Sequence, residues 1–361
     1  MSEKILRTID ELESYTDFSV DRNEKDELED IIFDHPMAVT EYYLNLMDWD
    51  DPDDPLVKMT IPSIDEDRGT GLLDPSGEKS NTKIRGLQHK YSQTALLLVT
   101  NNCATYCRHC FRKRFVGISF NEIADNMDAI IGYINDHTEI TNVLISGGDP
   151  LTLPTDKIID ILDRLSVVKH IQFIRIGTKI PVVLPSRISE DAKLTQFLGD
   201  YSRNKKQIYI NTQFNHPTEI TPNAVKAIDK LLDERVLINN QTVLLKGVND
   251  NAALMAKLQQ TLTRIGIIPY YIFQCRPVKG VKNIFQVPLL KGNRIVSSAR
   301  RMLDGPSKRF RFVMSHKEGK IEIIGREGNN LQFRYHQTKD SSLEGKIFSR
   351  EVDEKSCWLT I

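Results

Sequence analysis

The sequence predicts an α/β protein built as a partial or nearly closed barrel of six β/α units, similar to a TIM barrel. Between Thr94 and Arg276, six short apolar runs alternate with longer amphipathic stretches. The apolar runs are continuous, which is typical of parallel strands whose faces are covered by helices. Polar motifs follow several of these runs, and the chemistry of such barrels lies at the C-terminal ends of the strands.

The strands and helices are expected to follow one another in regular order along this central region. Strands are predicted at Ala95–Thr100, Asn142–Ser146, His170–Ile176, Gln207–Asn211, Val236–Leu245 and Ile268–Gln274. Helices are predicted at 121–137, 154–166, 189–199, 222–234 and 251–265. The fourth helix has Thr221 as N-cap and Pro222 in its first position, and both residue types favour a helix start there.

Two further regions flank the core and divide the chain into three parts. Residues 1–90 are acidic and irregular, and the turn-rich run Asp48–Pro55 favours a solvated linker between short helices over a metal site. Residues 277–361 are expected to contain a helix at 293–303 and β-prone runs at Phe310–Met314, Lys320–Ile324 and Leu331–Tyr335. We therefore predict an N-terminal helical extension (1–90), a barrel core (91–276) and a C-terminal β-rich tail (277–361).

The composition is that of a cytoplasmic enzyme. Hydrophobic residues make up 40% and charged residues 27% of the chain, which are ordinary values for globular proteins. The net charge of −1 gives no general attraction to nucleic acid or to an anionic membrane surface. No apolar run approaches the roughly 20 residues that span a bilayer. A membrane partner is therefore excluded, and nucleic acid is not expected as a partner.

Three of the five cysteines lie in the single short segment Cys103–Cys110, with Cys107 between them. This CxxxCxxC spacing lets three thiolates bind one [4Fe–4S] cube, whereas clusters used for electron transfer normally have four cysteine ligands. The iron without a protein ligand is then free to bind and cleave S-adenosylmethionine (SAM) into a radical. A zinc site with His109 as fourth ligand is a weaker alternative, because the paired-knuckle spacing is missing. A disulfide framework does not suit an odd cysteine count in a large chain.

Further polar motifs lie where strands are predicted to end. Ser146, Gly147, Gly148, Asp149 and Pro150 follow the second strand, where the glycines permit close backbone approach and the carboxylate can accept hydrogen bonds from an ammonium. The segments Asn211–His216, Asn239–Gln241 and Gln274–Arg276 lie at or within later strands. A single motif of this kind could be a simple turn, but their joint occurrence indicates a binding site.

These motifs together resemble the lysine 2,3-aminomutase family of radical SAM enzymes. The resemblance extends over about residues 40–325, and the chain is a divergent match. It is carried by the segments Gly86–Tyr91, Cys103–Arg114, Ser146–Leu151, Arg175–Pro185, Asn211–Pro217, Asn240–Asp250 and Pro269–Cys275. The resemblance implies an isomerase that moves an amino group between the α and β carbons of an amino acid, with a [4Fe–4S] cluster, SAM and pyridoxal phosphate (PLP) as cofactors.

The resemblance also assigns roles to single residues. Cys103, Cys107 and Cys110 correspond to the cluster ligands, and the SAM-binding positions are His109, Ser146, Gly147, Gly148, Asp149 and Gln241. Arg112 corresponds to the arginine that binds the substrate carboxylate, a task suited to a bidentate guanidinium. The alternative for Arg112 is one more charge in the basic loop that ends at Arg114.

The PLP site departs from the family pattern. Lys320 corresponds to the lysine that forms the imine with PLP, although Lys317 is a second candidate and an exposed hairpin lysine is the structural alternative. Lys90 and Tyr91 occupy phosphate-binding positions, and Thr94 replaces a further arginine. PLP binding is therefore expected, but by an altered set of residues.

The substrate pocket departs in charge. Two aspartates of the family read the distal ammonium of lysine, and this chain has Arg276 and Ser315 at those positions. An arginine repels a distal ammonium and leaves it unpaired. The predicted substrate is therefore an amino acid other than free lysine, with an acidic or polar distal group. The alternative is that Arg276 pairs with a carboxylate outside the pocket.

Other functions remain open at this stage. A PLP-independent radical SAM enzyme, such as an epimerase, a dehydrogenase or a modifying enzyme, is the main alternative. A redox sensor and an RNA-modifying enzyme are weaker ones. The expected partners are a small-molecule amino acid substrate, an electron donor such as flavodoxin or ferredoxin, and a second copy of the chain in a homo-oligomer. No role follows from the sequence for His336, Gln337 and Lys339.

Overall fold

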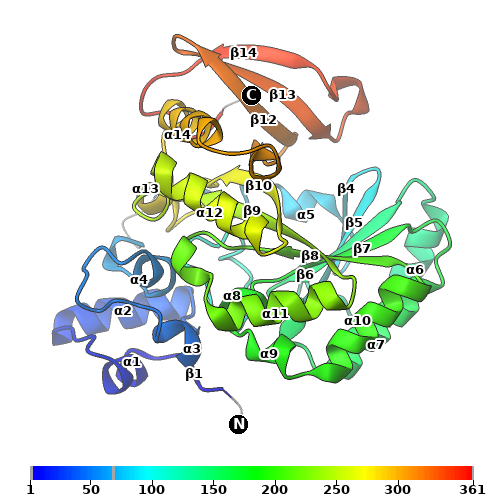
Figure 1. Cartoon of the computed structure of the whole chain (residues 1–361), viewed down its shortest axis with the longest axis horizontal. Helices are drawn as coiled ribbons and strands as arrows, with labels where there is room; N and C mark the ends of the chain where they lie inside the picture. The colour runs from blue at the N-terminus through cyan, green and yellow to red at the C-terminus, as the bar shows by residue number, and fades with distance from the viewer. Residues whose placement is uncertain (1–2, 67–69, 360–361) are drawn as a thin grey trace.

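The computed structural model describes residues 3–66 and 70–359 and is organised around one long sheet of twelve strands (Figure 1). The strand order in the sheet is β14-β13-β12-β11-β10-β9-β8-β7-β6-β5-β4-β3, so every strand neighbours the next one along the chain. In the described part of the chain, β3 and β14 are the edges of this sheet. The sheet is thus open, and the partial barrel predicted from the sequence is confirmed.

The core of the sheet is parallel. Its strands are β5 (Thr94–Thr100), β6 (Asn142–Gly147), β7 (Phe173–Gly177), β8 (Gln207–Thr212), β9 (Leu237–Leu244), β10 (Ile268–Gln274) and β11 (Arg311–Ser315). The first six were predicted, with β7 beginning three residues later than expected. The seventh, β11, pairs in parallel with β10 and carries the parallel sheet beyond residue 276 into the predicted tail.

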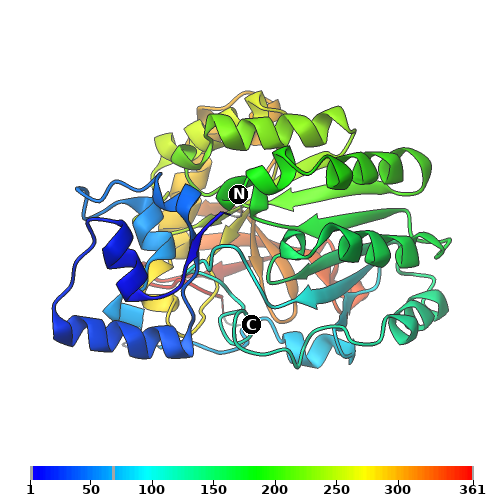
Figure 2. The same cartoon turned by 90° about the horizontal axis from the view of Figure 1, so that it is seen from below.

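Helices connect the parallel strands and cover the outer side of the sheet (Figures 1 and 2). They are α6 (Met127–Asp136), α7 (Thr155–Ser166), α8 (Ile180–Val183), α9 (Ser186–Ser189), α10 (Ala192–Asn204), α11 (Pro222–Asp233), α12 (Ala252–Arg264), α13 (Lys282–Phe285) and α14 (Leu289–Arg301). Thr221 caps α11 through the backbone N–H of Ala224, as predicted. The prediction for α6 was six residues too long at its start, because the N–H of Ala124 bonds to the carbonyl of Leu98 and keeps this segment extended along β5.

Antiparallel strands extend the sheet at both sides. On one side lie β3 (Thr82–Ile84) and β4 (Leu87–Tyr91), and on the other lie β12 (Gly319–Glu327), β13 (Asn330–Thr338) and β14 (Ile347–Glu351). The predicted runs at 320–324 and 331–335 form parts of β12 and β13. A tight turn at residues 316–318 joins β11 to β12, so β12 returns along the wall of the parallel core.

The N-terminal region is helical and packs beside the parallel core (Figure 2). It contains β1 (Ile5–Leu6), α1 (Ile9–Tyr15), α2 (Arg22–Asp34), β2 (Val39–Thr40), α3 (Glu41–Leu44), α4 (Pro55–Thr60) and α5 (Glu78–Asn81). The described part of the whole chain also has five short 3-10 helices, at Ile64–Glu66, Pro150–Thr152, Pro217–Glu219, Pro306–Lys308 and Ser341–Leu343. The same apolar core includes residues of this region and of the barrel, so the extension is joined to the barrel by packing. No helix in the described ranges is long and apolar enough to cross a membrane.

Candidate active site

A cavity of about 380 Å³ lies at the C-terminal ends of the parallel strands. Loops after β5, β6, β7 and β8 line it, together with residues of β9, β10, β11, β12 and β13. All the site residues predicted from the sequence lie on its wall, namely Lys90, Tyr91, Cys103, Cys107, His109, Cys110, Arg112, Ser146, Gly147, Gly148, Asp149, Gln241, Arg276 and Lys320. The fold therefore brings together residues that are more than 200 positions apart in the chain.

The three cysteines of the loop after β5 are free thiols that face this cavity. Burial raises the pKa of all three, and that of Cys110 reaches about 11. The thiols are therefore protonated at neutral pH, and iron must displace these protons when it binds. Three thiols on a half-buried loop that line the same cavity suit a cluster with one iron left without a protein ligand.

The cysteine loop is anchored to the N-terminal region by a buried ion-pair network. Nε and Nη2 of Arg108 donate to the two carboxylate oxygens of Glu66, at 2.7 and 2.6 Å. Lys113 also bonds to Glu66, and the side chains of all three residues are at most 4% exposed. The backbone N–H of Arg108 further donates to the carbonyl of Met59 at 2.8 Å. The extension thus fixes the loop that carries the cysteines.

The Ser146–Asp149 segment packs directly against the start of the same loop. The N–H of Gly148 donates to the carbonyl of Thr100 at 2.6 Å, and the N–H of Asp149 donates to that of Asn102 at 2.7 Å. A Cβ on Gly148 would lie 2.3 Å from the carbonyl oxygen of Asn102, so any side chain at this position would displace the loop. The two glycines are therefore needed for the close approach of two strand ends.

The side chain of Asp149 also binds the loop that follows a third strand, β7. Its carboxylate accepts hydrogen bonds from the N–H of Leu151 (3.0 Å), the hydroxyl of Thr178 (2.6 Å) and the N–H of Lys179 (2.6 Å). Burial raises its pKa to about 6, against the lowering effect of these donors. Asp149 therefore organises the cavity wall, and its remaining acceptor capacity is available to a ligand.

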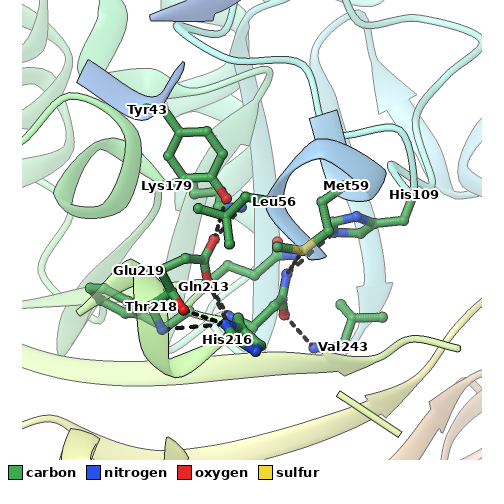
Figure 3. A network of polar contacts seen from close by, with 12 residues as sticks. Tyr43, Leu56, Met59, His109, Lys179, Gln213, His216, Thr218, Glu219 and Val243 are labelled. Carbon is green, nitrogen blue, oxygen red and sulfur yellow. Dashed lines mark hydrogen bonds and ion pairs between the residues drawn. The ribbon is translucent and has the colours of Figure 1, made fainter. Parts of the chain in front are cut away.

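His109 joins the cysteine loop to the loop after β8 (Figure 3). Its Nε2 atom lies 2.9 Å from Nε2 of Gln213 and 3.4 Å from Nδ2 of Asn215, whereas its buried Nδ1 atom has no partner among the described residues. Burial lowers the pKa of His109 well below its usual value, so the ring is neutral. Gln241, from β9, lies on the same cavity wall. Both residues offer polar atoms to a ligand.

Most of the hydrogen-bond donors of Arg112 are already used within the protein, which the sequence did not indicate. It uses one N–H of Nε and one of Nη2 for Glu78, and both of Nη1 for Ser146 and the carbonyl of Gly147, which accounts for four of its five N–H groups. Glu78, from α5, also accepts from Arg114 at 3.1 Å. Bidentate binding of a substrate carboxylate by Arg112 therefore requires Glu78 to move aside.

Arg276 differs from Arg112 because the described residues leave part of its guanidinium without a hydrogen-bond partner. Its Nη1 nitrogen is buried without a hydrogen-bond partner in the described part of the chain, and its guanidinium lies 3.7 Å from the centre of the Phe111 ring. Its pKa is lowered to about 10, mainly by burial, with Glu78 acting in the opposite direction and Arg112 in the same direction as burial. The residue projects into the cavity and makes no ion pair outside it among the described residues. An unpaired guanidinium in a cavity is a site for an anion.

Lys320 lies inside the cavity, on β12, whereas Lys317 is exposed in the turn before it. The ammonium of Lys320 donates to Oε1 of Gln337 at 3.2 Å and lies 4.3 Å from the centre of the Tyr271 ring. Burial lowers its pKa to about 7, helped by the nearby charges of Arg175 and Arg276. About half of such an amine is neutral at pH 7, and only the neutral amine attacks a carbonyl.

Two of the three residues that the sequence left without a role support Lys320. Gln337 accepts its hydrogen bond, and His336 holds the hydroxyl of Tyr271 at 2.8 Å, which fixes the ring under the ammonium. Lys339 is exposed and lies outside the cavity wall. Residues of β13 therefore orient the amine directly and through Tyr271.

Several donors beside Lys320 suit a phosphate. Lys90 donates to the carbonyl of His316 at 2.5 Å, and burial lowers its pKa to about 7. The Nε atom of Arg175 and the Nε2 atom of Gln88 are buried, have no partner among the described residues, and belong to residues that line the same cavity. Together with Tyr91, these groups fit a bound phosphate such as that of PLP.

The cavity wall carries a strong excess of positive charge. Among the described residues, its lining includes two carboxylates, those of Glu78 and Asp149, against eight cations: Lys90, Arg108, Arg112, Lys113, Arg175, Lys179, Arg276 and Lys320. Arg108 and Lys113 are compensated by Glu66 outside the wall. The remaining surplus favours ligands with several negative groups, such as phosphate and carboxylate.

Sequence reasoning gave no role to several residues on this wall, among them Glu78, Arg175 and Lys179. Arg175 had a detectable signal, because it is a lone arginine in the otherwise apolar strand Phe173–Gly177. Lys179 lay in a motif used for the resemblance but was given no role there. Glu78 had no local signal, since its partners Arg112 and Arg114 are more than 30 residues away.

Comparison with known proteins agrees with a radical SAM enzyme. A putative L-lysine 2,3-aminomutase of Aquifex aeolicus is 38% identical over 340 residues, covering 94% of this chain and 91% of that protein. The L-lysine 2,3-aminomutase of Fusobacterium nucleatum is 38% identical over 306 residues, with 83% and 69% covered. The glutamate 2,3-aminomutase of Clostridioides difficile is 36% identical over 303 residues, with 82% and 69% covered.

The chain therefore belongs to the lysine 2,3-aminomutase family, as its sequence motifs predicted. Membership implies an enzyme of the aminomutase type with a [4Fe–4S] cluster, SAM and PLP, and the thiols, amine and orphaned donors of the cavity fit these groups. No protein-family model matches the chain. A radical SAM methyltransferase from Sphaerobacter thermophilus has a TM-score of 0.37 at 14% identity, covering 63% of this chain and 68% of that one, which is too weak to add to the assignment.

Proposed function

We propose that the protein is a PLP-dependent 2,3-aminomutase whose substrate is an amino acid with an acidic or polar distal group, other than free lysine. The observation that carries the proposal is Arg276, whose buried guanidinium nitrogen faces the cavity without a partner among the described residues. A glutamate-like side chain would supply the missing carboxylate. A lysine side chain would place a second cation beside Arg276, which costs affinity.

The neighbouring charges support this choice of substrate. Besides burial, Arg175, Arg276 and Lys90 lower the pKa of Lys320, and Arg276 lowers that of Lys90, so this end of the cavity is already crowded with cations. Ser315 also lines the wall, and it is neutral where the family has an aspartate. With no described carboxylate other than Glu78 and Asp149 on the wall, nothing there favours a distal ammonium.

The residues divide into two groups by task. Cys103, Cys107 and Cys110 would hold the cluster, and the Ser146–Asp149 segment, His109 and Gln241 would hold SAM beside it. Lys320 would hold PLP, with Lys90, Tyr91, Arg175 and Gln88 around its phosphate. When bound, the cluster with SAM supplies a radical that abstracts hydrogen, and PLP carries the nitrogen that migrates.

The residues around Lys320 control where its proton lies. Gln337 accepts a hydrogen bond from the amine, while burial and the nearby cations favour its neutral form at Nζ. Arg112 would orient the α-carboxylate of the substrate once Glu78 has turned away from it. The enzyme would need a low-potential one-electron donor, such as flavodoxin or ferredoxin, and a reducing compartment such as the cytoplasm.

Trapping of the PLP lysine tests the proposal. The anaerobically reconstituted protein is incubated with PLP, reduced with borohydride and mapped by mass spectrometry. A pyridoxyl label on Lys320, retained in Lys317→Ala and lost in Lys320→Ala, is the expected result. No label on either lysine, with the cluster intact, would contradict PLP dependence and favour a PLP-independent radical enzyme.

A further inference from the structure

The cavity wall that carries the three cysteines also carries Lys179, the positive end of a buried ion pair. The ammonium of Lys179, in the loop after β7, is 2.9 Å from Oε1 of Glu219, and these side chains are 10% and 0% exposed. Lys179 and Cys107 line the same cavity, and the positive charge of Lys179 lowers the pKa of the Cys107 thiol against the larger, raising effect of burial. A charged group that interacts with a metal-binding sulfur from outside the ligand set changes the properties of the metal.

The position of this ammonium is closely defined. The backbone N–H of Lys179 is held by Asp149 at 2.6 Å, and its side chain passes the ring of Tyr43, whose centre lies 5.3 Å from Nζ. The hydroxyl of Tyr43 donates to Glu219 at 2.7 Å. Figure 3 shows these three side chains converging from the N-terminal region and the loops after β7 and β8.

Glu219 is itself fixed from the other side. Its Oε2 atom accepts from the backbone N–H groups of Asn215 (2.5 Å) and His216 (3.0 Å), so it cannot rotate away without leaving both unpaired. The pair is therefore a rigid dipole, and the residue at its positive end, Lys179, lies on the cavity wall that also carries Cys107. Maintaining such a pair in a buried place is costly, which favours a role beyond stability.

We propose that Lys179 is a positioning residue that raises the reduction potential of the cluster through the sulfur of Cys107, with Glu219 and Tyr43 holding its ammonium in place. The inference rests on the cluster assigned to the three cysteines in the proposed function. Reduction takes the [4Fe–4S] cluster from the 2+ to the 1+ state with one electron from a flavodoxin or ferredoxin. The cluster gains one negative charge, so a fixed positive charge stabilises the reduced state more than the oxidised one.

The sign of the effect differs between the two partners, which makes the test specific. Lys179→Met removes the positive end and should lower the potential. Glu219→Gln removes the negative end but keeps the ammonium, and should raise it. Lys179→Arg keeps the charge and should stay near the parent protein. Lys193→Met, at an exposed lysine that is 61% accessible, changes the net charge equally and should have no effect.

The experiment is an EPR-monitored redox titration of each reconstituted protein, in the absence of substrate, with iron and sulfide content measured on the same samples. For Lys179→Met we expect at least a tenfold fall in the ratio of reduced to oxidised cluster at a given potential, equivalent to 59 mV for a one-electron couple. A parental potential in both Lys179→Met and Glu219→Gln, with full iron content, would overturn the inference. If Lys179→Met does not hold iron, Glu219→Gln decides by the sign of its shift. Absence of iron from the parent protein would instead refute the cluster.

Discussion

Two walls of the cavity differ in how their charges are compensated. The cluster wall, formed by residues 103–114, 146–149 and 178–179, has its cations paired: Arg108 and Lys113 with Glu66, Arg112 with Glu78, and Lys179 with Glu219. The tail wall, formed by Lys90, Arg175, Arg276 and Lys320, has no ion pair among the described residues. Burial lowers the pKa of all four of these cations, and nearby cations lower those of Lys90, Arg276 and Lys320 as well.

This contrast separates the part of the site that performs radical chemistry from the part that selects the substrate. Paired charges hold the cysteine loop of the cluster wall in place, and of these pairs only that of Arg112 with Glu78 has to open for a substrate carboxylate. Unpaired cations leave the tail wall electrostatically incomplete, so an anionic ligand completes it. Changes in the cluster wall should therefore abolish activity with every substrate, and changes in the tail wall should alter affinity and specificity.

The largest effect is expected from loss of a cluster thiol. Cys110→Ala removes one of three iron ligands, so cluster assembly and cleavage of SAM should fall to background. Iron content and 5′-deoxyadenosine formation in the presence of dithionite are the measurements. The matched control is Cys275→Ala, at a buried cysteine that lies on the cavity wall but outside the cysteine loop. Normal cleavage of SAM by Cys110→Ala would refute the proposed ligand set.

The pairing of the cluster wall is broken by Glu66→Gln. This change leaves Arg108 and Lys113 buried without their carboxylate, and loss of one partner of a buried pair costs about 3–5 kcal/mol. The free energy of unfolding, from denaturant titration, should fall by that amount. The exposed pair of Lys193 and Asp156 serves as a control, because Asp156→Asn should cost only about 0–1 kcal/mol. Equal losses in the two variants would show that the wall does not depend on its buried network.

The tail wall is tested by Arg276→Asn. Truncating one partner of a buried charge pair costs about 2–5 kcal/mol, so kcat/KM for an acidic substrate should fall by roughly 30-fold or more. Cleavage of SAM in the absence of substrate should remain close to the parental rate. Lys279→Asn removes a neighbouring exposed charge and should change neither quantity. If Arg276→Asn left kcat/KM unchanged, the residue would not read the substrate.

A smaller effect concerns the protonation of Lys320. Its pKa is lowered from 10.5 to about 7, and the reactive form is the neutral amine, so labelling by PLP and borohydride should rise as the pH passes through about 7 and level off above it. Gln337→Leu should shift this midpoint, because it removes the acceptor of the amine's hydrogen bond. A midpoint near 10 in the parent protein would mean that Lys320 is solvated like a surface lysine.

Most of the parallel core could be predicted from the sequence, because each of its first six strands is a local apolar run. The seventh strand, β11, was expected only as a β-prone segment, since its parallel pairing with β10 depends on a contact that no local pattern encodes. The early start predicted for α6 failed for a similar reason. The hydrogen bond from Ala124 to Leu98 is a contact across the fold that overrides helical periodicity.

The site residues could likewise be predicted where their signal is local and could not where it depends on a contact across the fold. Cysteines and glycines have fixed spacings, so their meeting at the strand ends was foreseeable, and all the predicted positions line one cavity. The carboxylates that compensate the cations, Glu66, Glu78 and Glu219, were not foreseen. Each of them meets its partner across more than 30 residues of sequence, and a lone glutamate carries no signal of such a contact.

The most direct test of the account is a competition between substrates. The reconstituted enzyme with PLP, SAM and dithionite receives equal amounts of isotopically labelled L-glutamate, L-glutamine and L-lysine, and the β-amino acids formed are quantified by NMR. The account predicts that an acidic or polar amino acid is isomerised with a kcat/KM about a hundredfold or more above that of lysine, as an unpaired buried charge would impose. Formation of β-lysine at a rate equal to or above that of the other products would contradict it.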